Sequence, residues 1–263
     1  MPLIYEMQAL TWRARSTRQQ DAILINGKVI QHDGLISRHC HAAANAPWCA
    51  AVADGVSSSP GAEQAAQQLL DGVRQQASHS AQSISFQALQ QHLNRSLANN
   101  EKYYGASTTL ALVSHSSPQN FVNIQHLGDS RVYLFSSHSQ QWRCLTRDHN
   151  YLEQLRLNGE LQAGEQYATI YNALLYYFCA DPLHEVPELA AQEEYLTPDD
   201  ALLLCTDGLH DVMECHEWPA LQADMALKQW LKMVRQMLEE RKAYDNASMV
   251  LVRLTEGEKH DAE

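Results

Sequence analysis

Residues 51–61 read AVADGVSSSPG, in which a small apolar run leads to Asp54, Gly55, three serines and a Pro-Gly pair. The run is typical of a buried strand, and Asp54 stands where that strand ends. An Asp-Gly pair at a strand end is usually a plain turn. It can also deliver a carboxylate to a site at the edge of a sheet, and the rest of the sequence decides between the two interpretations.

The same arrangement recurs along the chain. Apolar segments meet an Asp beside Gly or Asn in AAVADG, IQHLGDSR, LLLCTDG and AYDNASMVLV, with RQQDAILI as a fifth variant. The aspartates concerned are Asp54, Asp129, Asp207, Asp245 and Asp21. Because strand ends on one side of a sandwich converge, these carboxylates are expected to gather in one pocket.

Such a cluster requires a cation, because several unpaired carboxylates at close range repel one another. Oxygen ligands without His or Cys companions select Mg²⁺ or Mn²⁺ rather than zinc. A glycine after a ligand Asp also lets a backbone carbonyl approach an ion closely. The sequence therefore predicts an acidic, binuclear metal site.

Composition excludes several other classes of protein. The chain has 263 residues, of which 45% are hydrophobic, which suffices for a sizeable core. The formal net charge of −12 disfavours binding to nucleic acid. No apolar run approaches the roughly 18–20 residues of a membrane-spanning helix, and the N-terminus lacks a signal-peptide pattern, so a cytoplasmic location without a membrane partner is expected.

The six cysteines form no CxxC pair and are interpreted as reduced core residues.

The sequence also lacks the motifs of nucleotide-binding enzymes and of serine hydrolases. Neither a Walker sequence nor GxGxxG occurs. No Gly-x-Ser-x-Gly elbow or Ser-His-Asp order surrounds the serines of the opening stretch, so no serine nucleophile is expected.

Hydrophobic patterning predicts a layered α+β fold, because strands and long helices are segregated along the chain. Strands are expected at 21–27, 28–34, 48–54, 107–115, 121–129, 130–137, 142–146, 200–208 and 246–254. Amphipathic helices are expected at 61–77, 85–100 and 218–242. The stretch 150–195 differs: its helical patches at 151–161 and 169–178 are broken by Gly and Pro, which indicates an insertion over a sheet.

Seven motifs in chain order resemble those of the metal-dependent protein phosphatases of the 2C type, and the bacterial cytoplasmic branch is the closer match. They are RQQDA, VADGVSSS, GASTTLAL, LGDSRVYLF, LTRDHN, LLLCTDGLHD and DNASMVLV, and the resemblance spans about residues 15–253. It implies a four-layer α-β-β-α sandwich, with two antiparallel sheets packed face to face and a helix pair outside each. It also implies a single domain over residues 1–263, with 150–195 as a flap beside the active site.

The resemblance implies catalytic roles for Asp21, Asp54, Asp207 and Asp245. Asp54 matches a ligand that bridges two Mn²⁺ or Mg²⁺ ions, and the carbonyl of Gly55 matches a ligand of the second ion. Asp207 and Asp245 match the remaining ligands of the first ion. Asp129 matches a residue that helps to hold a third, weaker ion. Asp21 matches a carboxylate that orients metal-bound water.

The implied activity is hydrolysis of phosphoserine or phosphothreonine in proteins. A hydroxide that bridges the two ions attacks phosphorus in line, without a covalent phospho-enzyme. Val56 stands where some relatives have His, so no side-chain acid is named. The expected partners are a phosphorylated protein and a cognate serine/threonine kinase, and the chain is expected to be a monomer.

The first motif departs from the family pattern. An arginine that clamps the substrate phosphate normally stands five residues before its Asp, where this chain has Ser16. Arg15 or Arg18 is the candidate replacement. Gln20 also replaces a common Glu, which weakens the support around the metals. These departures leave an alternative, an inactive pseudophosphatase that binds a phosphoprotein or kinase through the flap.

Overall fold

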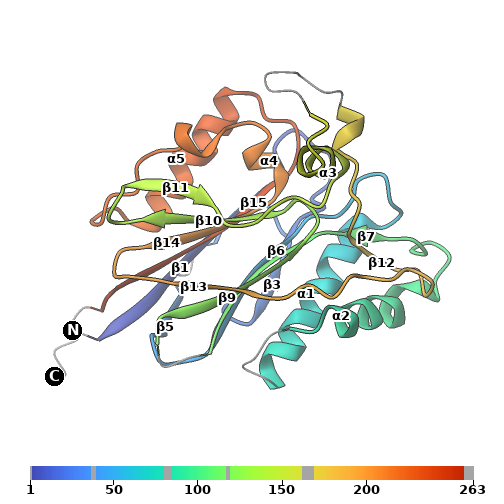
Figure 1. Cartoon of the computed structure of the whole chain (residues 1–263), viewed down its shortest axis with the longest axis horizontal. Helices are drawn as coiled ribbons and strands as arrows, with labels where there is room; N and C mark the ends of the chain where they lie inside the picture. The colour runs from blue at the N-terminus through green and yellow to red at the C-terminus, as the bar shows by residue number, and fades with distance from the viewer. Residues whose placement is uncertain (1, 37–39, 80–83, 117–118, 162–168, 258–263) are drawn as a thin grey trace.

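The fold is built on two large antiparallel sheets that pack face to face (Figure 1). The computed structural model describes residues 2–36, 40–79, 84–116, 119–161 and 169–257. The first sheet has the order β11 (Gln141–Cys144), β10 (Arg131–Ser136), β14 (Ala201–Cys205), β15 (Ala247–Glu256), β1 (Leu3–Trp12) and β4 (Gly34–Leu35), and β5 (Cys40–Ala43) also pairs with β1. The second has the order β13 (Gln192–Tyr195), β9 (Phe121–Leu127), β8 (Leu110–His115), β6 (Trp48–Ala53), β2 (Ala22–Ile25) and β3 (Lys28–Ile30).

Both faces of the central strands are buried, which explains their nearly continuous apolar sequences. In β14, Leu202 and Leu204 enter the core between the sheets, whereas Leu203 and Cys205 face the helices outside. Residues of β6 alternate in the same way between the central core and the outer layer. This alternation follows from the two-residue period of a strand.

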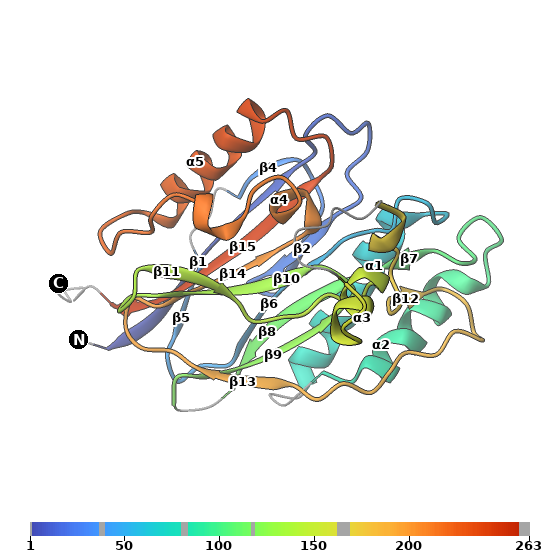
Figure 2. The ribbon, with the colours of Figure 1, turned by 45° about the horizontal axis from the view of Figure 1, so that its top comes forward.

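Helices cover the outer face of each sheet, which gives four layers (Figure 2). The second sheet is covered by α1 (Ala62–His79) and by α2 (Phe86–Leu93), which Ser85 caps and which a π-helical turn, Asn94–Ala98, continues. The first sheet is covered by α5 (Leu227–Glu240), together with the single-turn α4 (Asp207–His210) and a 3₁₀ turn, Cys215–Glu217. The predicted sandwich is confirmed.

The strand β1 is not among the predicted strands, although it lies near the centre of the first sheet. Its polar residues Glu6, Gln8 and Thr11 are buried, so its sequence shows no clear alternation. Each has a partner elsewhere in the fold: Glu6 pairs with Arg253 of β15, Gln8 donates to the carbonyl of Ile36 and Thr11 donates to the carbonyl of His32. Buried polar groups of this kind are stable only when such bonds form.

Two predicted helices are shorter than expected. Of the stretch 218–242, only Leu227–Glu240 is an α-helix. The segment from Pro219 to Ala226 is not helical, and its carbonyls at Gln222, Ala223 and Met225 accept hydrogen bonds from Arg253. Of the patch 151–161, only α3 (Tyr151–Leu157) is α-helical. The patch 169–178 is wrong as a helix: it forms a 3₁₀ turn, Thr169–Asn172, and then β12 (Phe178–Cys179), which pairs with β7 (Ser107–Thr108). Residues 162–168 of this stretch lie outside the described part.

The cysteines are all free, but only half of them are buried. Cys40, Cys179 and Cys205 are core residues, whereas Cys144 is exposed because β11 is the edge strand of its sheet. Cys49 and Cys215 are partly exposed. The prediction of a core position is therefore wrong for Cys144, because its neighbours in the sequence do not show that β11 is an edge strand.

The strand registers bring the predicted aspartates to one end of the sandwich. Ala22 pairs with Ala53, which sets Asp21 beside Asp54 at the end of the second sheet. Cys205 pairs with Arg131 and Met249, which sets the turns after β14 and before β10 and β15 together at the end of the first. None of the helices in the described ranges is long and apolar enough to cross a membrane.

Candidate functional site

Three hydrogen bonds fix the backbone of Asp54 at the end of β6. Its carbonyl accepts from the backbone nitrogen of Thr109 at 2.9 Å and from Oγ1 of Thr108 at 2.7 Å. Its own nitrogen donates to Oγ1 of Thr109 at 3.1 Å. Because the backbone of Asp54 is bonded to Thr108 of β7 and to Thr109, which joins β7 to β8, its position at the end of the sheet is fixed.

Gly55 lies where no side chain fits. A Cβ atom at this position would stand 2.4 Å from the carbonyl oxygen of Ala62, at the start of α1. The close approach of the Asp54 turn to α1 therefore requires glycine. This is a structural reason for the Asp-Gly pair, in addition to the expected exposure of its carbonyl to an ion.

Asp207 begins α4 directly after β14, and the next residue packs against the loop that holds Asp245. A Cβ atom on Gly208 would stand 1.9 Å from the carbonyl oxygen of Asn246. Hence the turn at Asp207 and the turn at Asp245 are in backbone contact. Asp245 itself is exposed, and its carboxylate accepts a hydrogen bond from the nitrogen of Asn246 at 2.8 Å.

The side chain of Asn246 ties the first motif to this site. Its Nδ2 donates to the carbonyls of Arg13 at 3.1 Å and Arg18 at 3.0 Å, and its Oδ1 accepts from the nitrogen of Gln20 at 2.6 Å. No role for Asn246 was predicted from the sequence, although this residue lies inside the motif DNASMVLV. Its amide is buried, so these bonds hold the 13–20 loop in place beside Asp21.

Asp21 is completely buried between the two sheets. Its Oδ2 accepts from Oγ1 of Thr206 at 2.9 Å, and the same hydroxyl accepts from the nitrogen of Ser248 at 3.0 Å. The hydroxyl of Ser248 also favours the charged form of Asp21, although it lies outside good hydrogen-bond geometry. Thr206 and Ser248 are therefore supporting residues that the sequence analysis does not identify.

Asp129 follows β9 through Gly128, whose φ is +101° and whose Cβ would stand 2.6 Å from Thr109. The backbone carbonyl of Asp129 lies 3.1 Å from Nε2 of His210, on α4. The carboxylate of Asp211 lies 3.2 Å from the other nitrogen of that ring, Nδ1. His210 and Asp211 thus position the Asp129 turn against the Asp207 turn, a pairing that the sequence does not reveal.

The carboxyl groups at this end interact strongly with one another. Burial raises the pKa of Asp54 well above its ordinary value, and repulsion from Asp207 and Asp21 raises it further. Burial also raises the pKa of Asp207 to about 7, although a hydrogen bond with Asp54 lowers it, and repulsion from Asp211 and Asp245 adds to the rise. Four of the five predicted aspartates are thus placed in one electrostatic cluster with the fifth, Asp245, at its exposed edge.

The pKa values of the other two aspartates in the cluster are raised as well. Burial raises the pKa of Asp21 to about 7, against the hydroxyls of Ser248 and Thr206, which lower it. Burial and repulsion from Asp207 raise the pKa of Asp129 to about 7. In each case the charged form is disfavoured unless a positive charge enters the cluster.

The chemistry of the cluster fits hard divalent cations. The five aspartates offer only oxygen donors, which hard cations prefer. One carboxylate oxygen of Asp21 and one of Asp207 are buried without a hydrogen-bond partner in the described structure. Among the residues that the structure describes, no three His, Cys, Asp or Glu side chains are arranged to hold a metal ion. The fit to a cation therefore rests on the donor chemistry and on the two unpartnered carboxylate oxygens.

Neither candidate arginine contacts the cluster. Arg15 is exposed, and its backbone nitrogen donates to the carbonyl of Tyr244 at 3.3 Å, which places it next to Asp245. Arg18 is exposed and lies 3.9 Å from the carboxylate of Glu63, at the start of α1. The backbone of Arg15 thus lies beside Tyr244, whereas the side chain of Arg18 reaches Glu63 of α1.

A cavity of about 540 Å³ adjoins the Asp54 turn. Its walls come from the loop after Gly55, from Gly105 and Ser107, and from the 172–177 part of the stretch predicted as a flap. The volume is in the range of pockets that bind small ligands or side chains. The 172–177 segment thus lies beside the loop that follows Asp54.

Replacement of Thr206 by Val is expected to lower the free energy of unfolding by about 1–3 kcal/mol, because the nitrogen of Ser248 and Oδ2 of Asp21 each lose a buried partner. Thr206→Ser keeps the hydroxyl and serves as the control. Urea unfolding of the two variants checks this, and equal stability of Thr206→Val and the wild type would show that the hydroxyl does not support the site.

Comparisons with known proteins show a matching family and similar solved structures. Residues 26–253 match the model of the family described as protein phosphatase 2C. Among solved structures, the serine/threonine phosphatase PstP/Ppp of Mycobacterium tuberculosis is similar at 17% identity and a TM-score of 0.72, over 96% of this chain and 100% of that one. Stp1 of Staphylococcus aureus is similar at 20% identity and a TM-score of 0.71, over 95% of each chain.

A third similar structure contains metal. The catalytic domain of PstP in complex with two manganese ions has 17% identity and a TM-score of 0.69, over 97% of this chain and 100% of that one. No curated protein matches the sequence significantly. The match to the family model covers most of the chain, so it belongs to the protein phosphatase 2C family of serine/threonine protein phosphatases.

Proposed function

We propose that this chain is an active, metal-dependent phosphoserine/phosphothreonine phosphatase that uses two Mn²⁺ or Mg²⁺ ions. The observation that carries the proposal is the coupled, buried carboxylate cluster of Asp54, Asp207 and Asp21. Such a cluster is unfavourable without a cation, and it persists here at the place where the family's motifs converge. Manganese in a similar phosphatase supports the choice of ion.

The proposed ligands are Asp54, shared by both ions, the carbonyl of Gly55, and Asp207 with Asp245. When bound, the ions would lower the pKa of a water molecule between them and offset the charge on the phosphoryl oxygens. Asp21, held by Thr206, is a positioning residue that orients water in the site. Asp129 is proposed to hold a third, weaker ion.

We propose a single in-line displacement by water, without a phospho-enzyme. Two serines of the loop after Asp54, Ser57 and Ser59, support this, because their hydroxyls are already engaged. Ser59 donates to the carbonyl of Val56 at 2.8 Å and accepts from the nitrogen of Ser107 at 3.0 Å. Ser57 donates to Oε1 of Gln20 at 2.9 Å. Val56 offers no proton, so the leaving group must take its proton from water.

Arg15 is the better candidate for the substrate phosphate, because its loop is bonded to Tyr244 beside Asp245. The residues around the phosphorylated side chain are proposed to enter the 540 Å³ cavity that the 172–177 segment lines. Residues 150–195 would then serve as the flap of one domain that spans 1–263. Exposed apolar side chains of this stretch, Ile170, Leu175 and Tyr176, offer contact surface to a protein substrate.

The substrate is proposed to be a phosphorylated protein, either the target of a serine/threonine kinase or the kinase itself. The chain is proposed to act in the cytoplasm as a monomer, without nucleic acid or membrane. The net charge of −12 supports the exclusion of nucleic acid, because phosphate backbones repel such a surface.

Removal of divalent ions is expected to lower hydrolysis of p-nitrophenyl phosphate or of a phosphothreonine peptide at least about 100-fold, since the ions contribute several kcal/mol to the barrier. Added Mn²⁺ is expected to restore it. Steady-state rates with EDTA, and after Mn²⁺ is added in excess, check this. Activity that survives EDTA would contradict the binuclear mechanism.

A pseudophosphatase is the second candidate, which Ser16 favours because the usual arginine is missing there. Isothermal titration with Mn²⁺ separates the two. Binding of two ions together with turnover supports the phosphatase. Failure to bind two ions at millimolar Mn²⁺, together with binding of phosphopeptide, would support the pseudophosphatase.

A further inference from the structure

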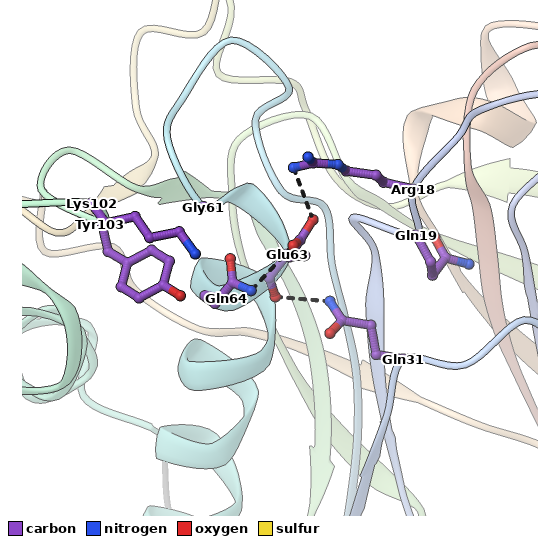
Figure 3. A pocket seen from close by; sticks show the side chains of 8 residues that line it. All are labelled: Arg18, Gln19, Gln31, Gly61, Glu63, Gln64, Lys102 and Tyr103. Atoms are coloured by element: carbon purple, nitrogen blue, oxygen red, sulfur yellow. Dashed lines mark hydrogen bonds and ion pairs between the residues drawn. The ribbon is translucent and has the colours of Figure 1, made fainter.

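A polar cavity of about 640 Å³ lies beside the first turn of α1, between Arg18 and Lys102 (Figure 3). Its walls come from the loop before β2, from the strand-to-strand connection after β3, from the first turn of α1 and from the loop before β7. The lining residues are Arg18, Gln19, Gln31, Gly61, Glu63, Gln64, Lys102 and Tyr103. The set contains no aliphatic side chain, so it is suited to a polar ligand.

Two cations reach this cavity from opposite walls. Figure 3 shows Arg18 extending over the first turn of α1 from one side and Lys102 pointing toward the same turn from the other. The ammonium of Lys102 makes no ion pair within the described part of the chain, and it lies 5.0 Å from the ring centroid of Tyr103. In a chain with a net charge of −12, two cations that line one cavity favour an anionic ligand there.

Glu63 is the one acid in the cavity, and it holds Arg18 only weakly. The two charges stand 3.9 Å apart, and 72% of the Arg18 side chain is exposed. Exposed pairs of this kind contribute about 0–1 kcal/mol. An entering anion can therefore compete for Arg18, and the cavity retains a formal charge of +1 with Arg18, Lys102 and Glu63 counted.

The cavity has fixed walls. Gly61 has a φ of +66°, and a Cβ there would stand 2.5 Å from the ring of Tyr103, so the ring packs directly on the backbone of this turn. Nε2 of Gln31 donates to the carbonyl of Glu63 at 2.8 Å, which ties the connection after β3 to α1. The amide of Gln64 donates to Oε1 of Glu63 at 3.2 Å. The two cations thus project from a bonded frame.

The same two chain segments build this cavity and the carboxylate cluster. Gln19 lines the cavity and accepts a hydrogen bond from the nitrogen of Asp21 at 3.3 Å. Gly61 lies on the loop that begins at Asp54, and Ser57 of that loop bonds to Gln20. Gln19 is two residues from Asp21, and two residues of extended backbone span at most about 7 Å. A substrate held at the cluster therefore comes within a few residues of the wall that Gln19 forms.

We propose that this cavity is an anion subsite for the substrate, in which Arg18 and Lys102 bind a carboxylate or a second phosphoryl group a few residues from the phosphorylated side chain. The proposal rests on the proposed phosphatase function and adds a sequence preference to it. It also gives Arg18 a role away from the reacting phosphate, which Arg15 is left to bind.

The test compares phosphothreonine peptides that differ only in their flanks. One has neutral flanks, two carry glutamates on the N-terminal or the C-terminal side, and a fourth carries a second phosphothreonine. With Mn²⁺ present, kcat/KM is expected to be about 10-fold higher for at least one of the three anionic peptides than for the neutral peptide. This factor corresponds to one good charge contact. The glutamate and phosphate arms show which anion the subsite takes.

Two substitutions with opposite expected effects on the preference for anionic peptides test whether this cavity is the subsite. Lys102→Gln is expected to remove most of the preference, while p-nitrophenyl phosphate hydrolysis is unchanged. Glu63→Gln is expected to increase the preference a few-fold, because it removes the competing carboxylate. Lys228→Gln, which removes an exposed charge from α5, is the matched control and is expected to change neither.

Binding of fluorescein-labelled peptides, followed by fluorescence anisotropy, gives a second measurement that needs no turnover. Equal affinity and equal kcat/KM for neutral and anionic peptides, with Mn²⁺-dependent p-nitrophenyl phosphate hydrolysis intact, would overturn the subsite and leave the phosphatase standing. Absence of that hydrolysis would overturn the phosphatase. Tighter binding of the anionic peptide that Lys102→Gln abolishes would then still support the anion site.

Discussion

Asp54→Asn is expected to lower kcat for p-nitrophenyl phosphate and for a phosphothreonine peptide by about 1,000-fold or more. The proposed role of Asp54 is to join two ions, so its replacement affects both of them, and a loss of about 4 kcal/mol of transition-state stabilisation corresponds to this factor. The backbone bonds from Thr108 and Thr109 do not involve the carboxyl group. The variant is therefore expected to keep its fold.

Thermal unfolding without divalent ions separates a chemical from a structural effect of this substitution. The carboxyl of Asp54 is disfavoured by burial and by repulsion from Asp207 and Asp21, so neutral Asn is expected to leave the metal-free protein as stable as the wild type or more stable. The stabilisation that Mn²⁺ confers on the wild type is expected to disappear. Asp224→Asn, at an exposed position, serves as the control for both measurements. Near-normal turnover by Asp54→Asn would exclude it as a bridging ligand.

Gly208→Ala is expected to have the second largest effect, on stability and turnover together. The added Cβ would stand 1.9 Å from the carbonyl oxygen of Asn246 and 2.8 Å from its carbonyl carbon, and these are backbone atoms that cannot rotate away. The turn at Asp207 must therefore move away from the turn at Asp245. Overpacking of this kind costs about 1–3 kcal/mol or more, and displacement of a catalytic group by about 1 Å can cost roughly 100-fold in rate.

Urea unfolding and steady-state kinetics measure the two parts of this prediction. Gly27→Ala is the matched control: its φ of +66° gives backbone strain, but its Cβ would meet nothing within 4 Å, and it lies at the opposite end of β2 from Asp21. A modest loss of stability with normal turnover is expected for Gly27→Ala. If Gly208→Ala matched it in both measurements, contact between the two turns would have no functional weight.

The aspartates were predictable because the signal is local: each one lies within two residues of the end of an apolar strand, and strand ends on one side of a sandwich converge. The supporting residues were not predictable in this way. Thr206 meets Asp21 across 185 positions of sequence, and Asn246 meets Gln20 across 226. Short-range patterns report the period of a strand and carry no information about which distant strand becomes its neighbour.

The same limit explains the errors in secondary structure. The strand β1 was missed because Glu6 is a polar residue buried against Arg253, 247 positions away, which hides the alternation. The 169–178 patch has the composition of a helix, yet Phe178 pairs with Thr108 of β7. Tertiary pairing outweighed local propensity at both places.

The sequence by itself determined the layered α+β class, the order of the motifs and the positions of the five aspartates at strand ends, because these depend on residue type and short spacing. Only the tertiary structure decided that Asp21 is enclosed between two sheets and that Asn246 anchors the loop of the missing arginine. It also decided that Arg18 turns toward Glu63 and Lys102. Those outcomes depend on side chains that meet across strand registers, and no stretch as short as AVADGVSSSPG contains both partners of such a contact.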